Sequence, residues 1–252
     1  MTQTKDDSRR VALVTGGSSG IGAATALKLA EDGYDVAIGH LTGGDRAEAT
    51  AQAVRALGRA GYPVRIDVGS QDSVATAYQR VVTSLGEPEV LVNSAGSFFE
   101  LRPFQEIDNE LWRRSLELNL MGAINCSRAA VDAMITKGRG RIINLSSVVT
   151  RTGGAGESMH YAVAKGGLET FTLGLAREVG RHGVLVNAVA PGLVDTAIHN
   201  EYRERLERLA STYGLLGRAG TAAEIAVVVA FLASDAASFV TGQVWHVNGG
   251  AA

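Results

Sequence analysis

Short apolar runs alternate with longer amphipathic segments along most of the chain. Seven runs have the length and apolar content of buried strands, at residues 11–15, 34–39, 62–67, 90–96, 140–147, 184–192 and 242–249. Apolar residues recur at helical spacing between them, at residues 21–33, 46–58, 74–86, 109–138, 161–183 and 222–234. Strands that are apolar on both faces are typical of parallel sheets covered by helices. The pattern therefore predicts an α/β fold with a doubly wound, seven-stranded parallel sheet in one domain, residues 1–252.

Composition narrows the function classes without naming a function. The chain is 46% hydrophobic and 20% charged, with a net charge of −2, and it carries no basic stripe that would indicate nucleic-acid binding. Its longest apolar run, residues 225–233, is too short to span a membrane. The polar N-terminal segment lacks the apolar core of a signal peptide, and Cys126 is the single cysteine. We expect a cytoplasmic protein without a membrane or nucleic-acid partner. The five histidines show no paired spacing, so we expect no metal site.

A glycine-rich loop follows the first predicted strand and opens the first predicted helix. Gly16, Gly20 and Gly22 are spaced as G-x-x-x-G-x-G. Glycines allow a tight turn in which the backbone approaches a diphosphate, and the helix N-terminus favours its charge. This placement predicts a Rossmann-type dinucleotide site built from Gly16, Ser18, Ser19, Gly20, Ile21 and Gly22.

The tip of the second predicted strand bears on the choice of cofactor. Folds that prefer NAD usually place an acid there to bind the ribose hydroxyls. Here the strand ends Gly-His-Leu-Thr, and the first acid is Asp45. Nothing at the tip would repel a 2′-phosphate, and His40, Thr42 or Arg46 could contact one. We therefore favour NADP (NADPH), with NAD as the alternative.

Tyr161 and Lys165 are one helical turn apart, so both side chains can point into the same space. A nearby ammonium stabilises a phenolate and lowers the pKa of the phenol, which could then act as a general acid toward a carbonyl oxygen. Ser147 ends a predicted strand, where its hydroxyl could bind the same oxygen. A Tyr-x-x-x-Lys pair is common by chance, and alone it is better explained as a packed aromatic beside a surface lysine.

Other motifs appear in a fixed order around this pair: NSAG at 93–96, Asn119 within LELNLMG, and PGLVDT at 191–196. With the glycine loop they resemble the short-chain dehydrogenase/reductase superfamily, in its compact single-domain branch. The resemblance runs from about residue 10 to residue 250. The compact single-domain branch includes 3-oxoacyl reductases and sugar dehydrogenases.

The resemblance implies a role for each matching residue. Tyr161 would be the acid/base, Lys165 would bind the nicotinamide ribose, Ser147 would orient the substrate carbonyl, and Asn119 would hold a water that joins Lys165 to solvent. The remaining cofactor contacts would come from Asp67 and Val68 at the adenine, from Asn93, Ala95 and Gly96 at the adenosine ribose, and from Pro191, Gly192, Val194 and Thr196 at the carboxamide.

Two departures from the family pattern affect these roles. Ser94 stands where the family usually has a second asparagine, and the gap from Ser147 to Tyr161 is one residue longer than the commonest spacing. The second departure leaves Ser146 as an alternative to Ser147 for the active hydroxyl. His160, next to Tyr161, could touch substrate, cap the helix or be solvated.

The charged segment at about 195–217 is predicted to be a substrate lid, with a surface helix as the alternative, and Phe98, Phe99 and Met159 are expected to flank the pocket mouth. In the family that the chain resembles, an apolar final strand of this kind helps to build dimers and tetramers. We therefore expect a homo-oligomer, a dimer or a homotetramer.

The sequence thus predicts an oxidoreductase that transfers hydride between a nicotinamide and a small-molecule carbonyl or secondary alcohol. NADPH-linked carbonyl reduction of the 3-oxoacyl type is favoured. The alternatives are an NAD-linked sugar or polyol dehydrogenase and, from another class, a non-catalytic cofactor-sensing protein.

Overall fold

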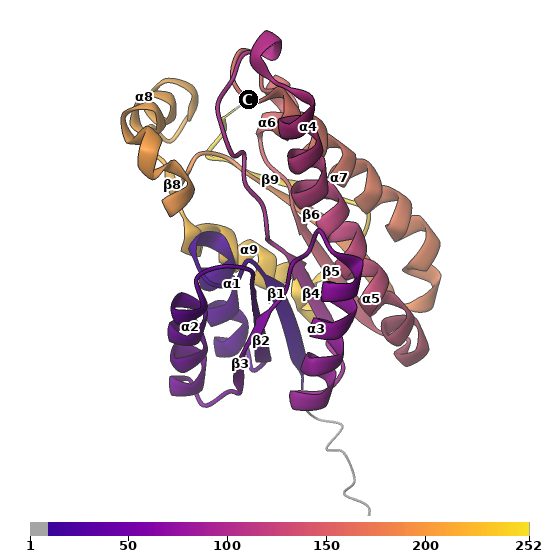
Figure 1. The fold of residues 1–252 in the computed structure, drawn as a ribbon. Coiled ribbons are helices and arrows are strands. Elements are labelled where there is room, and N and C mark those ends of the chain that lie inside the picture. Colours follow the sequence, from indigo (N-terminus) through magenta and orange to yellow (C-terminus); the bar gives the residue numbers. More distant parts are fainter. Residues whose placement is uncertain (1–9, 252) are drawn as a thin grey trace, which may run out of the picture.

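Seven parallel strands form the centre of the computed structural model, which describes residues 10–251 (Figure 1). They lie in the order β3-β2-β1-β4-β5-β6-β9. Their bounds are β1 Val11–Thr15, β2 Asp35–His40, β3 Gly61–Arg65, β4 Val90–Asn93, β5 Gly140–Leu145, β6 Val184–Pro191 and β9 Val244–Val247. The chain winds outward from β1 to β3 and returns to the other side of β1 as β4. This confirms the predicted doubly wound sheet, whose switch point between β1 and β4 is where such folds bind ligands.

Helices cover both faces of the sheet and bury two separate cores. One face packs against α1 (Gly20–Glu31), α2 (Gly44–Ala56) and α9 (Ala222–Ala233). The opposite face packs against α3 (Gln71–Ser84), α5 (Gly122–Lys137) and α7 (Met159–Val179). The side chains of β1 alternate between these cores, with Ala12 and Val14 in the first and Val11 and Leu13 in the second.

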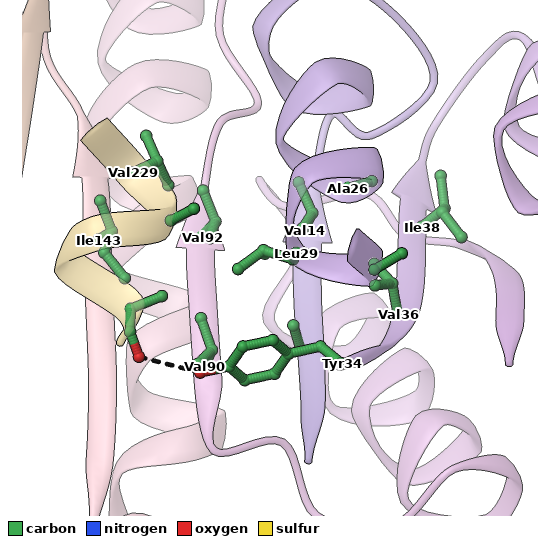
Figure 2. Packing of buried hydrophobic residues seen from close by; sticks show 14 of the residues in the cluster. Val14, Ala26, Leu29, Tyr34, Val36, Ile38, Val90, Val92, Ile143 and Val229 are labelled. Atoms are coloured by element: carbon green, nitrogen blue, oxygen red, sulfur yellow. Dashed lines mark hydrogen bonds between the residues drawn. The ribbon is translucent and has the colours of Figure 1, made fainter. Parts of the chain in front are cut away.

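Figure 2 shows the first core, where Leu29 and Val229 reach from α1 and α9 onto the strands. Tyr34, which leads into β2, closes its lower end by donating a hydrogen bond to the Ala233 carbonyl oxygen at 3.0 Å. This bond ties the start of β2 to the C-terminal end of α9, far away in sequence.

The predicted helix at 109–138 is interrupted, which corrects the sequence analysis. It consists of α4 (Asn109–Leu116), a π-helical turn η2 (Glu117–Met121) and α5. The apolar spacing runs through the interruption, so periodicity alone does not reveal it. A π-turn adds a residue to one turn and is often found at functional sites. Here it places Asn119 inside the protein, 1% exposed.

Several short elements were too brief to predict. They are η1 (Phe104–Glu106), α6 (Val149–Thr152), the strand pair β7 (Val194–Asp195) and β8 (Gly220–Thr221), and the 3-10 turns η3 (Gly180–His182), η4 (Ala197–Tyr202) and η5 (Asp235–Ala237). The predicted lid segment contains η4 and α8 (Arg203–Tyr213), and Figure 1 shows α8 set off from the helices that cover the sheet. None of the helices within residues 10–251 is long and apolar enough to cross a membrane.

Candidate active site

A cleft of about 660 Å³ lies at the carboxyl ends of the central strands. It is lined by most of the residues that the sequence singled out: Gly16, Ser18, Ser19, Gly20, Ile21, Gly22, His40, Thr42, Asp67, Val68, Ala95, Gly96, Ser147, Tyr161, Lys165, Pro191, Gly192, Val194 and Thr196. Residues at or after the ends of six strands, β1 to β6, and from α7 thus meet in one space, as expected at a topological switch point.

The turn between β1 and α1 has no room for a side chain at Gly16 or Gly22. A Cβ on Gly22 would lie 2.3 Å from the Gly16 carbonyl oxygen, and Gly16 itself has a φ of +65°. Ser19 precedes α1 and makes no side-chain hydrogen bond to the helix, so the first backbone N–H groups are left for another acceptor. This bare backbone and open helix N-terminus fit a diphosphate.

The end of β2 offers no carboxylate to the cleft. His40, Leu41 and Thr42 line the cleft there, whereas Asp45 is not among its lining residues. The buried Nδ1 of His40 has no hydrogen-bond partner among the described residues. The Arg46 guanidinium lies against Gly43, just beyond the tip.

The segment after β4 is held by a residue that sequence reasoning missed. The Thr15 hydroxyl accepts hydrogen bonds from the backbone N–H groups of Ser94 and Ala95, each at 3.1 Å. Thr15 ends the first strand, directly before the glycine turn, so one side chain couples the two backbone segments of the predicted diphosphate and ribose sites. Its position at a strand end was the signal that could have identified it.

Asn93 is not among the residues that line the cleft, and its predicted contact with the adenosine ribose stays a prediction. Its side chain is 4% exposed and donates a 2.8 Å hydrogen bond to the Asn144 Oδ1. Asn144 in turn donates to the Thr172 hydroxyl at 2.9 Å. This buried chain of polar groups links β4, β5 and α7 beneath the site.

Asn119 lies behind the cleft wall, beside Lys165. Its side-chain amide accepts from the Ser97 backbone N–H at 3.0 Å and donates to the Ser97 carbonyl oxygen at 2.8 Å. A Cβ on Gly96 would lie 2.8 Å from the Asn119 Oδ1 and 3.2 Å from the Lys165 Nζ. The side chains of Asn119 and Lys165 therefore share the small space that the absence of a Gly96 side chain creates.

The structure distinguishes the two candidate serines. The Ser146 hydroxyl, in a residue 4% exposed, donates to the Glu169 carboxylate at 2.6 Å. Both serines line the cleft, and the Ser147 hydroxyl lies next to the Tyr161 phenol, where it acts to lower the pKa of Tyr161. Ser147 rather than Ser146 is thus the hydroxyl that faces the tyrosine.

Burial governs the charges of Tyr161 and Lys165 in the protein alone. It raises the pKa of Tyr161 to about 12, against the smaller effect of Ser147. It lowers the pKa of the Lys165 ammonium to about 8. The Lys165 Nζ donates to the Leu145 carbonyl oxygen at 2.7 Å and lies 5.5 Å from the centre of the Tyr161 ring. The predicted lowering of the Tyr161 pKa by Lys165 is therefore not seen here.

His160 is neither solvated nor in contact with the cleft, unlike the predicted alternatives. It is 0% exposed, and its Nε2 lies 2.9 Å from the Phe98 carbonyl oxygen. Because a carbonyl oxygen only accepts, Nε2 carries the proton, and the buried Nδ1 has no partner among the described residues. Phe98 lines the cleft, whereas Phe99 and Met159 do not.

Three segments enclose the outer part of the cleft. The Phe98 ring lies against Tyr161 and against Tyr202 of η4, with ring centres 6.4 and 5.9 Å apart. Arg205 of α8 forms an ion pair with Glu157, in which its Nε donates to the Glu157 Oε1 at 2.9 Å. The Arg102 backbone N–H donates to the Glu157 carbonyl oxygen at 2.6 Å. The predicted lid segment is therefore attached to both neighbouring loops.

Comparison with known proteins places this geometry in a family. Residues 16–252 match the family described as enoyl-(acyl carrier protein) reductase. The chain is 44% identical over 241 residues to the 3-oxoacyl-(acyl-carrier-protein) reductase FabG of Pseudomonas aeruginosa, covering 96% of each chain. It is 41% identical over 241 residues to the cis-4-hydroxycyclohexanecarboxylate dehydrogenase of Sinomonas cyclohexanicum, again covering 96% of each chain.

A crystal structure described as that of a gluconate dehydrogenase from Agrobacterium tumefaciens has the same fold. It superimposes with a TM-score of 0.89 at 32% sequence identity, over 96% of this chain and 95% of that one. These similar proteins are named for different substrates, although each covers nearly the whole chain.

Proposed function

Because this chain belongs to the short-chain dehydrogenase/reductase family, we propose that it reduces 3-oxoacyl thioesters with NADPH. As a member it is an NAD(P)-dependent oxidoreductase that interconverts carbonyl and CH–OH groups. The observation that carries the proposal is that Ser147, Tyr161 and Lys165 line the same cleft as the glycine turn. The name of the Pseudomonas relative supports the 3-oxoacyl substrate.

Tyr161 is the general acid of the proposed reaction. Its pKa of about 12 keeps the phenol protonated at neutral pH, which is the form that a reduction requires. When bound, the reduced nicotinamide supplies the hydride. As the carbonyl carbon gains it, the substrate oxygen becomes a much stronger base and takes the Tyr161 proton. Ser147 donates a hydrogen bond to the same oxygen, where negative charge develops. Oxidation would run the same proton transfer in reverse and would need Tyr161 as the phenolate.

Lys165 and Asn119 support this proton transfer. With a pKa of about 8, Lys165 is mainly charged at neutral pH and carries two donors beyond the one given to Leu145. Lys165 would donate these two hydrogen bonds to the nicotinamide ribose hydroxyls. Asn119, beside Lys165 at Gly96, would hold the water that returns a proton to the site.

The cofactor is proposed to be NADPH. The β2 tip presents His40 and Thr42 but no carboxylate to the cleft, and α2 begins at Gly44 with Asp45 and Arg46 in its first turn. A 2′-phosphate at the tip would face a helix N-terminus and could pair with Arg46, while Asp45 of the same turn does not line the cleft. The diphosphate would lie on the β1–α1 turn, and Pro191, Gly192, Val194 and Thr196 would hold the carboxamide.

The alternative is NAD-linked oxidation of a sugar, polyol or hydroxy acid. The gluconate and hydroxycyclohexanecarboxylate names of two similar proteins favour it. A cofactor-sensing protein without chemistry leaves the Ser147–Tyr161–Lys165 set unexplained. We also propose that the protein is a homotetramer, and its cytoplasmic location stays a prediction.

The test is reduction of acetoacetyl-coenzyme A followed by the loss of NADPH absorbance. Wild type should turn over and should prefer NADPH to NADH by at least about tenfold in kcat/KM. Tyr161→Phe should lose about 10²–10⁴-fold in kcat because the proton donor is removed while the ring remains. Equal rates for the variant and wild type would exclude Tyr161 as the acid, and a preference for NADH would favour the alternative.

A further inference from the structure

The substrate side of the cleft contains one charged pair in a largely apolar wall. Glu157, four residues before Tyr161, and Arg205 of the predicted lid helix both line the cleft. Their neighbours on this side include Phe98, Leu101, Val149, Ile198 and Leu209. A charge at this place acts directly on whatever group the substrate places there.

The Arg205–Glu157 pair is a two-point contact. The Nε and Nη2 atoms of Arg205 donate to the two carboxylate oxygens of Glu157, the geometry that makes arginine–carboxylate pairs strong. The Arg205 side chain is 20% exposed and that of Glu157 is 42% exposed. The Glu157 backbone is fixed as well, by the Arg102 N–H and by its own N–H to the Gly154 carbonyl oxygen.

This arrangement disfavours an anionic substrate. A substrate carboxylate that approached Arg205 would have to break both contacts and would leave the Glu157 carboxylate unpaired beside it. Arg205 also holds the pKa of Glu157 below its usual range, so the opposing negative charge persists at neutral pH. An ester, thioester or ketone meets no such repulsion.

We infer that Glu157 is a specificity-determining residue, which neutralises Arg205 and selects uncharged carbonyl substrates over free oxo acids. The inference rests on the proposed function, because it names the chemical class of substrate for the same site. It also assigns opposite effects to the two members of the pair. Removing the Glu157 charge frees a cation in the wall, whereas removing the Arg205 charge leaves an unpaired anion.

Ethyl acetoacetate and acetoacetate test this inference, since they share the reacting ketone and differ in the charge of the neighbouring group. With NADPH, wild type should favour the ester in kcat/KM. Glu157→Gln should raise the ratio of kcat/KM for the acid to kcat/KM for the ester by at least about tenfold. The change should come mainly from a lower KM for the acid, because the unpaired Arg205 cation then attracts the substrate carboxylate. Arg205→Gln should leave the ratio at or below that of wild type.

Glu48→Gln is the matched control. It removes the same charge from an exposed pair with Arg55 on α2, outside the cleft, and should leave the ratio unchanged within about twofold. An unchanged ratio in Glu157→Gln would overturn the inference. So would a wild type that prefers the acid and loses that preference in Arg205→Gln, because Arg205 would then bind the substrate carboxylate itself.

A binding measurement separates this inference from the proposed function. Butyrate should raise the melting temperature of Glu157→Gln, with NADPH present, more than that of wild type, and butyramide should affect both proteins equally. Failure of wild type to reduce either ketone would count against the proposed function alone, and the butyrate result would still decide the inference. Glu157→Ala provides a second variant if the glutamine variant does not fold.

Discussion

At the scale of one residue, Lys165 shows how a charge that the proposed reaction needs is kept in a buried position. Lys165 is 3% exposed, and among the described residues its ammonium donates one hydrogen bond, to the Leu145 carbonyl oxygen. Burial therefore brings its pKa down from 10.5 to about 8. Perturbed pKa values of this kind cluster at functional sites, where stability is given up for chemistry.

The stability cost of Lys165 should depend on pH in a defined direction. Below about pH 8 the folded and the unfolded chain both carry the charged amine, and the folded state bears its full burial cost. Between about pH 8 and 10.5 the unfolded chain binds more protons, so the folded state gains stability as the pH rises. Lys165→Met, which cannot titrate, should lose roughly 2 kcal/mol of stability relative to wild type between pH 7.5 and 10. Urea unfolding at several pH values measures this.

Lys137→Met is the control, because Lys137 is exposed on the last turn of α5. Its stability relative to wild type should not change over the same range. A flat difference for Lys165→Met as well would show that Lys165 keeps an ordinary pKa in the folded protein.

His160 positions the loop after β4 through its Nε2–H bond to Phe98. His160→Leu removes the hydrogen bond that His160 donates to this buried carbonyl oxygen, which should cost about 1 kcal/mol of stability. Because Phe98 contacts Tyr161 and Tyr202, the substrate KM should rise several-fold while the dissociation constant of NADPH stays near that of wild type. His160→Gln retains a donor and should recover most of the KM. Equal KM values in all three proteins would exclude the positioning role.

At the scale of an element, the β1–α1 turn depends on the absence of two side chains. In Gly22→Ala the new Cβ would meet the Gly16 carbonyl oxygen at 2.3 Å, so the turn must open and the diphosphate site with it. NADPH affinity, measured by fluorescence or calorimetry, should fall by at least about a hundredfold. Gly174→Ala on α7 is the control: no atom lies within 4 Å of the new Cβ, and the helix should gain about 0.5–1 kcal/mol with unchanged NADPH affinity. Wild-type affinity in Gly22→Ala would show that the turn does not hold the cofactor.

The elements also show where sequence reasoning reaches its limit. The strands and the main helices were predictable because each buries a periodic apolar face, as Val11 and Leu13 do against one core and Ala12 and Val14 against the other. The π-turn at Glu117–Met121 was not, since one extra residue does not disturb the apolar spacing around it. The pair β7–β8 has two residues per strand, too few for any pattern.

For the whole molecule, the predictable part of the site is the part that strand ends position, and the rest depends on tertiary packing. Residues at the ends of parallel strands must meet at one edge, so Ser147 and the glycine turn could be placed together from sequence. Asn93 also ends a strand, but its amide turns inward to Asn144, a choice that tertiary packing makes. The Glu157–Arg205 pair joins two segments 48 positions apart through long side chains, and no local sequence pattern predicts such a contact.

Exposed apolar side chains near one edge of the sheet support the prediction that copies of this chain assemble into a tetramer. Phe239 is 103% exposed and lies between η5 and β9, the strand at one edge of the sheet, and Val227 on the nearby α9 is 54% exposed. A second copy that covered these side chains would remove them from water and protect the edge strand.

Light scattering should therefore give wild type a mass about four times the 26.3 kDa of one chain. Phe239→Asp should lower that mass, because a carboxylate would have to be buried at the contact between copies. Leu57→Asp, at an apolar residue 45% exposed beside α2, should leave the mass unchanged. A wild type with the mass of one chain would contradict the tetramer, and unchanged assembly in Phe239→Asp would move the contact away from the β9 edge.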